Sequence, residues 1–124
     1  MLFSIIDTTK PIIHIPHEKD YRRWRDRLGD EYNAIMNTLD AMISNGGEVH
    51  TSSWMPGSDW EGTAFQSIYT IACEHDEVAA GLCFGLFLWV AMQNRPEAWA
   101  FGRYEKDGIP IRGLTYFTIN LPST

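Results

Sequence analysis

The feature that most constrains this chain is an apolar segment of fifteen residues, VAAGLCFGLFLWVAM (78–92). A membrane-spanning helix needs about 20 such residues, and this segment lies between the acidic stretch EHDE (74–77) and the polar stretch QNRP (93–96). It therefore predicts a buried helix of a protein that does not enter a membrane. Since the segment is apolar on nearly all sides, we expect it to be covered all round, by a sheet and by helices or a second subunit.

Two further helices are predicted before this segment. From residue 18 to 44 the large apolar residues recur at helical spacing, and the stretch SNGG (44–47) ends that helix. Gly29-Asp30 either divides it into two helices or lies inside one, and the pattern leaves both open. The second of these helices is predicted to begin at Ser58, which forms a capping box with Glu61, and to run to about Cys73. Either His75 or Asp76 is expected to cap the apolar helix.

The strand signals lie mainly at the two ends of the chain. LFSII (2–6) and PIIHI (11–15) predict an N-terminal hairpin, and residues 98–106 and 109–121 predict a C-terminal hairpin around Asp107-Gly108. One more short strand is expected at 48–54. A chain of 124 residues fits one domain. We therefore predict a single α+β domain, in which an antiparallel sheet from the two hairpins carries three helices packed on one face.

The net charge and the cysteine content narrow the possible binding partners and the possible cellular compartment. The net charge of −6 disfavours nucleic-acid binding through overall charge. Cys73 and Cys83 have no metal-type spacing and are interpreted as free, buried thiols of a reducing cytoplasm. The N-terminus lacks the basic and long apolar regions of a signal peptide. These features predict a cytoplasmic protein.

The stretch TSSWMPGSDWEGT (51–63) is the first candidate site. Helix capping explains its acids, but it leaves Trp54 and Trp60 as either core residues or the walls of a groove. The alternative functional hypothesis is a small-ligand pocket between this loop and the C-terminal hairpin, lined by Trp54, Trp60, His50, Asp59 and Arg103. His50, His75, Asp59, Glu74 and Asp76 could also converge on a metal, but no metal-binding spacing is present. No metal or cofactor is predicted.

The second candidate site is a basic patch on the first helix, formed by Lys19, Arg22, Arg23 and Arg27. It could bind a nucleic-acid backbone or an acidic partner. The simpler interpretation is a solvated helix face on which acids pair with these bases, for example Glu18 with Arg22.

No nucleophile elbow, phosphate-binding loop or other diagnostic catalytic motif is present, so catalytic activity is left uncertain and not favoured. The aromatic content and the apolar helix favour a non-catalytic protein-interaction module. We expect it to act as a homodimer through residues 78–92, because two-fold dimers are the commonest oligomers. A protein partner of another kind is possible, a membrane partner is not expected, and nucleic acid is the least favoured.

Overall fold

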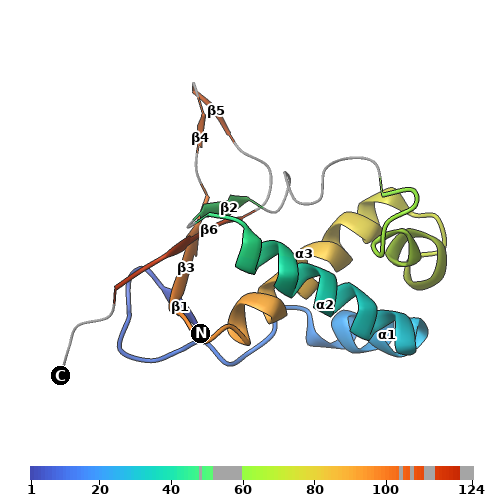
Figure 1. The fold of residues 1–124 in the computed structure, drawn as a ribbon, viewed down its shortest axis with the longest axis horizontal. Coiled ribbons are helices and arrows are strands. Elements are labelled where there is room, and N and C mark those ends of the chain that lie inside the picture. The colour runs from blue at the N-terminus through green and yellow to red at the C-terminus, as the bar shows by residue number, and fades with distance from the viewer. Residues whose placement is uncertain (48, 52–59, 104, 107, 111–113, 121–124) are drawn as a thin grey trace.

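The computed structural model describes residues 1–47, 49–51, 60–103, 105–106, 108–110 and 114–120, and Figure 1 shows their fold. A four-stranded sheet and a group of helices form a single α+β domain, which confirms the predicted class. The helices are α1 (Glu18–Leu28), α2 (Asp30–Asn45), the π-helix η1 (Ile68–Ala72) and α3 (Glu77–Gln93). The sheet has the order β1-β3-β6-β2, from strands β1 (Leu2–Ser4), β3 (Trp99–Gly102), β6 (Thr115–Thr118) and β2 (Val49–Thr51).

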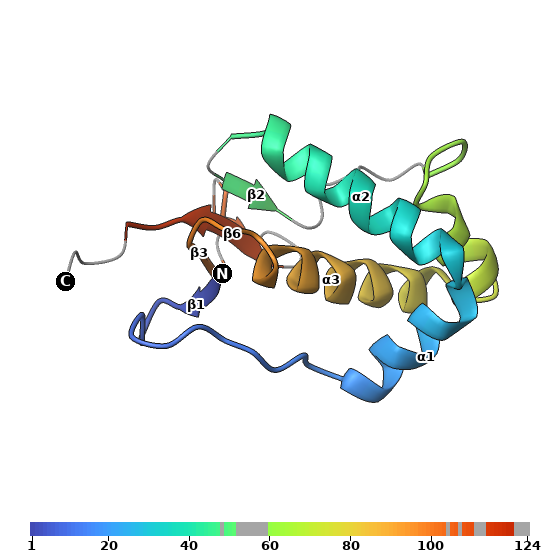
Figure 2. The ribbon, with the colours of Figure 1, turned by 60° about the horizontal axis from the view of Figure 1, so that its bottom comes forward.

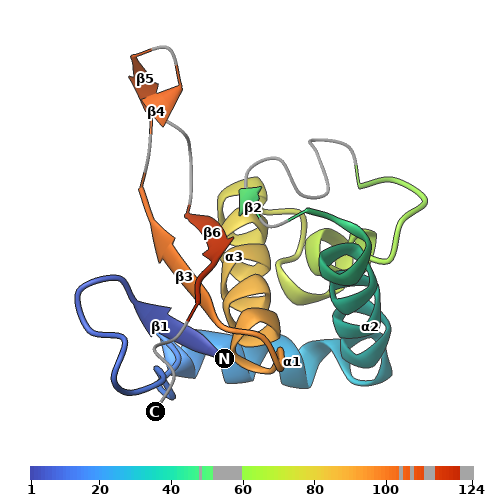
Figure 3. The ribbon, with the colours of Figure 1, turned by 60° about the vertical axis from the view of Figure 1, so that its left-hand side comes forward.

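The C-terminal hairpin forms as predicted. Strands β3 and β6 pair antiparallel, with Phe101 opposite Tyr116, and β2 extends the sheet antiparallel to β6. Beyond them, β4 (Glu105–Lys106) and β5 (Ile109–Pro110) pair antiparallel as a separate two-stranded sheet that projects from the body of the domain (Figure 3).

The predicted N-terminal hairpin is wrong. Residues 11–15 form no strand, although the Ile12 amide donates a hydrogen bond to the Leu2 carbonyl at 2.7 Å. Pro11 and Pro16 flank this segment and have no amide hydrogen for a ladder. Strand β1 instead pairs parallel with β3, Leu2 opposite Trp99. The sheet is therefore mixed, with one parallel and two antiparallel pairs.

Gly29 divides the first predicted helix into α1 and α2. Its φ of 56° lies in the left-handed region that favours glycine, and its amide closes α1 by donating to the Arg25 carbonyl. The stripe predicted from the sequence is confirmed for Tyr21, Trp24, Leu28, Ile35 and Leu39, which are all buried. Its last predicted member, Met42, is only half-buried, and Ile43 is buried instead.

The helix predicted from Ser58 to Cys73 begins later than expected. Ser58 itself lies outside the described residues, and residues 61–65 form turns and a bend before the helical residues that lead into η1. Gly62 has a φ of 76°, and the Thr63 hydroxyl donates to the Trp60 carbonyl at 2.7 Å. These local bonds compete with helical geometry. The cap of α3 is Asp76, one of the two predicted alternatives, whose side chain accepts from the amides of Val78 and Ala79 at 3.0 and 3.1 Å.

Helix α3 lies between α1 and α2, and its C-terminal end reaches the sheet (Figure 2). Its side chains fill the core, where Cys83, Phe87, Leu88 and Met92 are fully buried. The sheet and the helices of this domain leave one side of α3 open, where Val78 is 76% exposed and Leu82 is 61% exposed. Cover of this side by a second subunit stays a prediction. Among the described residues, no helix combines the length and the apolar character needed to cross a membrane.

Candidate functional site

A groove of about 400 Å³ runs along the incompletely covered side of α3. Three parts of the chain line it: the start of α1, the exposed stripe of α3, and the sheet strands that meet the end of α3. The lining residues are Pro16, His17, Asp20, Trp24, Gly81, Leu82, Gly85, Leu86, Trp89, Arg103, Leu114 and Tyr116. The groove is thus mainly apolar, with charged groups from α1 and from the end of β3.

Two glycines form the floor of the groove. Gly81 and Gly85 are four residues apart and therefore lie on the same face of α3. A β-carbon added at either position would meet nothing within 4 Å. The helix surface is consequently bare here, and neighbouring side chains do not fill the space above it.

Aromatic rings form the walls and are held in place by the core. Trp24 and Trp89 are 5% and 6% exposed, so most of each ring is packed and one edge borders the groove. The Trp89 indole nitrogen donates to the His14 carbonyl at 3.1 Å, and its ring lies 4.8 Å from that of Phe101. These contacts fix the wall before any ligand arrives.

The polar lining residues differ in how they are paired. The Asp20 carboxylate forms an ion pair with the Arg23 guanidinium, and 3.1 Å separate Oδ1 of Asp20 from Nη1 of Arg23. His17 precedes α1 in the left-handed region, with a φ of 50°. Arg103 is exposed and follows directly after β3. The groove therefore offers one cation that no described carboxylate neutralises.

The residues predicted for a ligand pocket do not converge. Of the three that the structure describes, Arg103 lines the groove, whereas Trp60 and His50 lie elsewhere. Trp60 is half-buried, with its ring 5.7 Å from Phe84 and 6.4 Å from Phe65. Trp54 and Asp59 lie outside the described residues.

His50 is a core residue on β2. Its ring lies 5.5 Å from that of Trp99, and Nε2 makes no hydrogen bond within the described part of the chain. Burial lowers the pKa of the imidazole, against a smaller opposite effect of the Gly47 and Ile43 carbonyls. The neutral form of the imidazole is favoured here, because the charged form would lose its hydration in apolar surroundings.

The basic patch on α1 is exposed, and acidic side chains lie next to its arginines. Its arginines pair with carboxylates at 2.9–3.7 Å, and Arg27 also donates to the Ala72 carbonyl at 2.9 Å. Arg23 lies over the Trp24 ring, 5.4 Å from its centroid. Pairing of this kind matches the solvated-face interpretation and reduces the charge left for a phosphate backbone. The pairs are Arg22–Glu18, Arg23–Asp20 and Arg27–Glu74.

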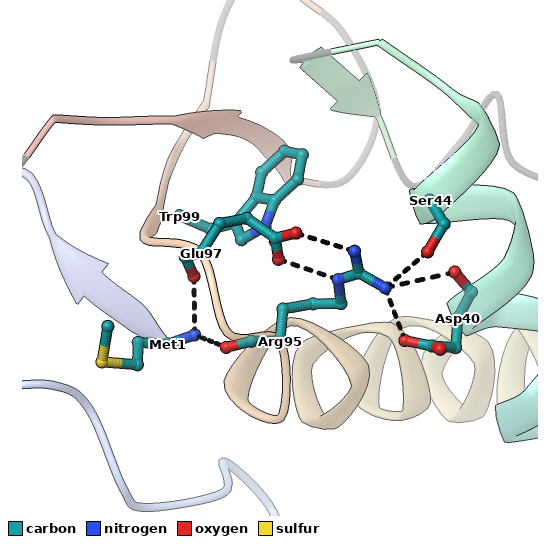
Figure 4. Close-up of polar contacts among 6 residues, drawn as sticks. All are labelled: Met1, Asp40, Ser44, Arg95, Glu97 and Trp99. Atoms are coloured by element: carbon teal, nitrogen blue, oxygen red, sulfur yellow. Dashed lines mark hydrogen bonds and ion pairs between the residues drawn. The ribbon is translucent and has the colours of Figure 1, made fainter.

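A polar cluster that no sequence pattern predicted lies just beyond the C-terminal end of α3 (Figure 4). The Arg95 side chain, 12% exposed, binds both oxygens of Glu97 at 2.7 and 2.8 Å. It also binds Asp40 and Ser44 of α2, each at 2.7 Å. The Trp99 indole donates to Glu97 at 3.1 Å, and the Met1 amine donates to the Arg95 and Glu97 carbonyls.

This cluster is a clamp between α2 and the turn that leads into β3. The hydrogen bonds from Arg95 hold the pKa of Glu97 at about 2, far below its usual value. A carboxyl group with so low a pKa stays ionised near neutral pH and is a poor general base. No simple pattern could reveal the clamp, because Asp40 and Arg95 are far apart in sequence.

The two cysteines are free and buried, as predicted. Cys73 lies directly after η1 and Cys83 lies on α3, and burial raises the pKa of both thiols. Such thiols are weak nucleophiles. No three metal-binding side chains gather anywhere in the described ranges.

Comparisons of the chain with protein-family models, with curated proteins and with solved structures found no match. The function is therefore inferred from the residues and the shape of the groove. The sequence indicated only that another backbone could approach closely at Gly81 and Gly85, which are four residues apart. It did not indicate the walls, because Trp24, Trp89 and Tyr116 read equally well as ordinary core residues.

Proposed function

We propose that the protein is a non-catalytic binding protein that holds a small, mainly apolar molecule in the groove on α3. The observation that carries this proposal is the open floor of Gly81 and Gly85 between the rings of Trp24 and Trp89. Ligand sites in proteins typically measure about 300–1,000 Å³ and combine apolar walls with a few polar groups. The groove, at about 400 Å³, has this size and this composition.

The packing of the walls supports the same proposal. The two Trp rings are nearly buried without a ligand, so binding would not require them to become ordered. A preformed site avoids much of the entropic cost of association. Because Gly81 and Gly85 carry no side chains, a ligand can contact the backbone of α3 directly.

The test fills the floor of the groove. Gly85→Leu places a side chain in open space and replaces glycine by a better helix former, so the variant should remain folded. The neutral probe N-phenyl-1-naphthylamine should fluoresce on binding to the wild type, and Gly85→Leu should weaken that binding at least tenfold. Ala41→Leu is the control, because Ala41 is exposed on α2. Equal probe binding by all three proteins contradicts the proposal.

A second candidate function is self-association through α3, and the exposure of Val78 and Leu82 favours it. These side chains lie one helical turn apart beside Gly81 and Gly85, which allow close approach of a second helix. Two copies packed in this way would cover the stripe that the domain leaves open. Both functions can use the same helix face, so they compete for it.

Sedimentation equilibrium tests this second candidate. The wild type should sediment at about twice 14.2 kDa, and Leu82→Glu should return it to the monomer mass. Ile5→Glu is a matched control, because Ile5 is 60% exposed against 61% for Leu82 and lies in a loop. A wild-type monomer at micromolar concentration rules self-association out and leaves the ligand groove as the function.

We also infer a reducing, cytoplasmic setting for the protein. The support is the pair of free, buried thiols, Cys73 and Cys83, which form no disulfide. Cell fractionation that recovers the protein from an oxidising compartment contradicts this inference.

A further inference from the structure

Arg103 differs from the other described arginines in having no acidic partner. Among the described residues, Arg22, Arg23, Arg25, Arg27 and Arg95 each lie within 3.7 Å of a carboxylate oxygen. Arg103 makes no ion pair with any side chain that the structure describes, although the chain carries a net charge of −6. An arginine at the wall of a groove that no described carboxylate pairs with suits an anion from outside.

Tyr116 provides a second polar group in the same wall. Its side chain is 1% exposed and lines the groove, yet its hydroxyl makes no hydrogen bond with another described residue. Burial raises the pKa of this hydroxyl, so it stays protonated and can donate. The Tyr116 hydroxyl is not among the buried side-chain atoms that lack a partner in the described part of the chain. Because Tyr116 lines the groove, its hydroxyl can donate to an acceptor that binds there.

The strand register brings these two groups to one place. Phe101 lies opposite Tyr116, and Gly102 lies opposite Thr115 in the last pair of β3 and β6. Arg103 follows by one residue, so its side chain is on the same face of the sheet as Phe101 and Tyr116. Diagonal neighbours of this kind lie about 7–8 Å apart at their α-carbons, within reach of a long side chain. One small anion can contact both.

We propose that the groove binds a small carboxylic acid with an apolar body. The carboxylate pairs with the Arg103 guanidinium and accepts a hydrogen bond from the Tyr116 hydroxyl. The body lies over Gly81 and Gly85, against the rings of Trp24 and Trp89. This inference rests on the proposed function, since it names the ligand class of the same groove. Asp20, the other charged lining residue, is already paired with Arg23 and opposes the anion less than a free carboxylate would.

The experiment compares three probes with the same apolar chain and different head groups: octanoate, octanol and octylamine. Isothermal titration of the wild type should give octanoate an affinity at least tenfold above that of octanol, with octylamine the weakest. Arg103→Gln should abolish the preference for octanoate and leave octanol unchanged. Arg22→Gln, which removes an exposed arginine outside the groove, should keep the preference.

Tyr116→Phe separates the role of the hydroxyl from a structural one. If the hydroxyl awaits a ligand, the variant should melt at or above the wild-type temperature, and its octanoate affinity should fall about threefold to tenfold. A lower melting temperature with unchanged octanoate affinity contradicts the assignment of Tyr116.

The outcomes distinguish the two proposals. Equal affinity of the wild type for octanoate and octanol overturns the carboxylate inference and leaves the proposed function standing. An unchanged preference in Arg103→Gln likewise overturns the inference. Failure of all three probes to bind overturns both, because the shared apolar body would then have no site.

Discussion

The clamp around Arg95 leads to a prediction whose size can be worked from the structure: Glu97→Gln should destabilise the fold by about 2 kcal/mol. The Glu97 carboxylate accepts three hydrogen bonds, two from Arg95 and one from the Trp99 indole, at 2.7–3.1 Å. A hydrogen bond to a charged group contributes about 1.5–3 kcal/mol. Glu97 is 38% exposed, so water screens part of this gain, and the amide of Gln keeps an acceptor oxygen. Because of this screening and of the remaining acceptor oxygen, we expect a loss of stability of about 2 kcal/mol, which is less than three full hydrogen bonds to a charged group would give.

Urea denaturation near neutral pH measures this loss. For a chain of this length, about 2 kcal/mol corresponds to a fall of about 8 °C in the melting temperature. Asp40→Asn is the control, since Asp40 binds the same arginine but is 64% exposed. An exposed pair contributes about 0–1 kcal/mol, so this variant should change stability much less. Equal losses for the two variants, or a Glu97→Gln loss below about 0.5 kcal/mol, refute the clamp.

The same variant predicts a pH dependence. The pKa of Glu97 is about 2 in the folded protein, below its ordinary value of 4.5. The stabilisation by the carboxylate is therefore fully present above about pH 4.5 and is lost as the pH falls toward 2. The wild type should lose its advantage over Glu97→Gln across this range. An undiminished gap at about pH 2.5 contradicts the reasoning.

Three more predictions follow from the core. Leu88→Ala should cost about 3 kcal/mol in a urea melt, because Leu88 is fully buried; a cost below 1 kcal/mol would place it outside the core. Gly46→Ala should cost about 1–3 kcal/mol, since its β-carbon would lie 2.3 Å from Cε1 of His50, and an unchanged stability would show that this contact is wrong. Cys73 and Cys83 should react with a disulfide thiol reagent at the rate of unfolding, and prompt labelling of either in the native protein would contradict their burial.

Local patterns predicted the parts of the fold that depend on neighbouring residues. The apolar run 78–92 became α3, and the stripe from Tyr21 to Leu39 became the buried faces of α1 and α2. The segments predicted to pair in the C-terminal hairpin contain β4 and β5, which pair antiparallel. Each of these signals arises within one element or one turn. They sufficed for the α+β class.

Long-range pairing could not be predicted in the same way. The short strand β1 has two possible partners, the segment 11–15 beside it and the distant β3, and no local pattern favours the second. The groove depends on several such choices, because it exists where α1 leaves one stripe of α3 uncovered. Arg103 was singled out from the sequence, but its neighbours Trp24, Trp89 and Tyr116 were not.

The indole resonances offer the most direct test of the groove. In an amide-proton NMR spectrum of the labelled protein, titration with octanoate should shift the indole N–H signals of Trp24 and Trp89, which wall the groove. The Trp99 signal should stay in place, because that indole donates to Glu97 and does not line the groove. Assignment by single Trp→Phe variants makes the comparison unambiguous. Shifts confined to Trp24 and Trp89 are the predicted result; unshifted Trp24 and Trp89 signals, or a shift centred on Trp99, would contradict a ligand site on α3.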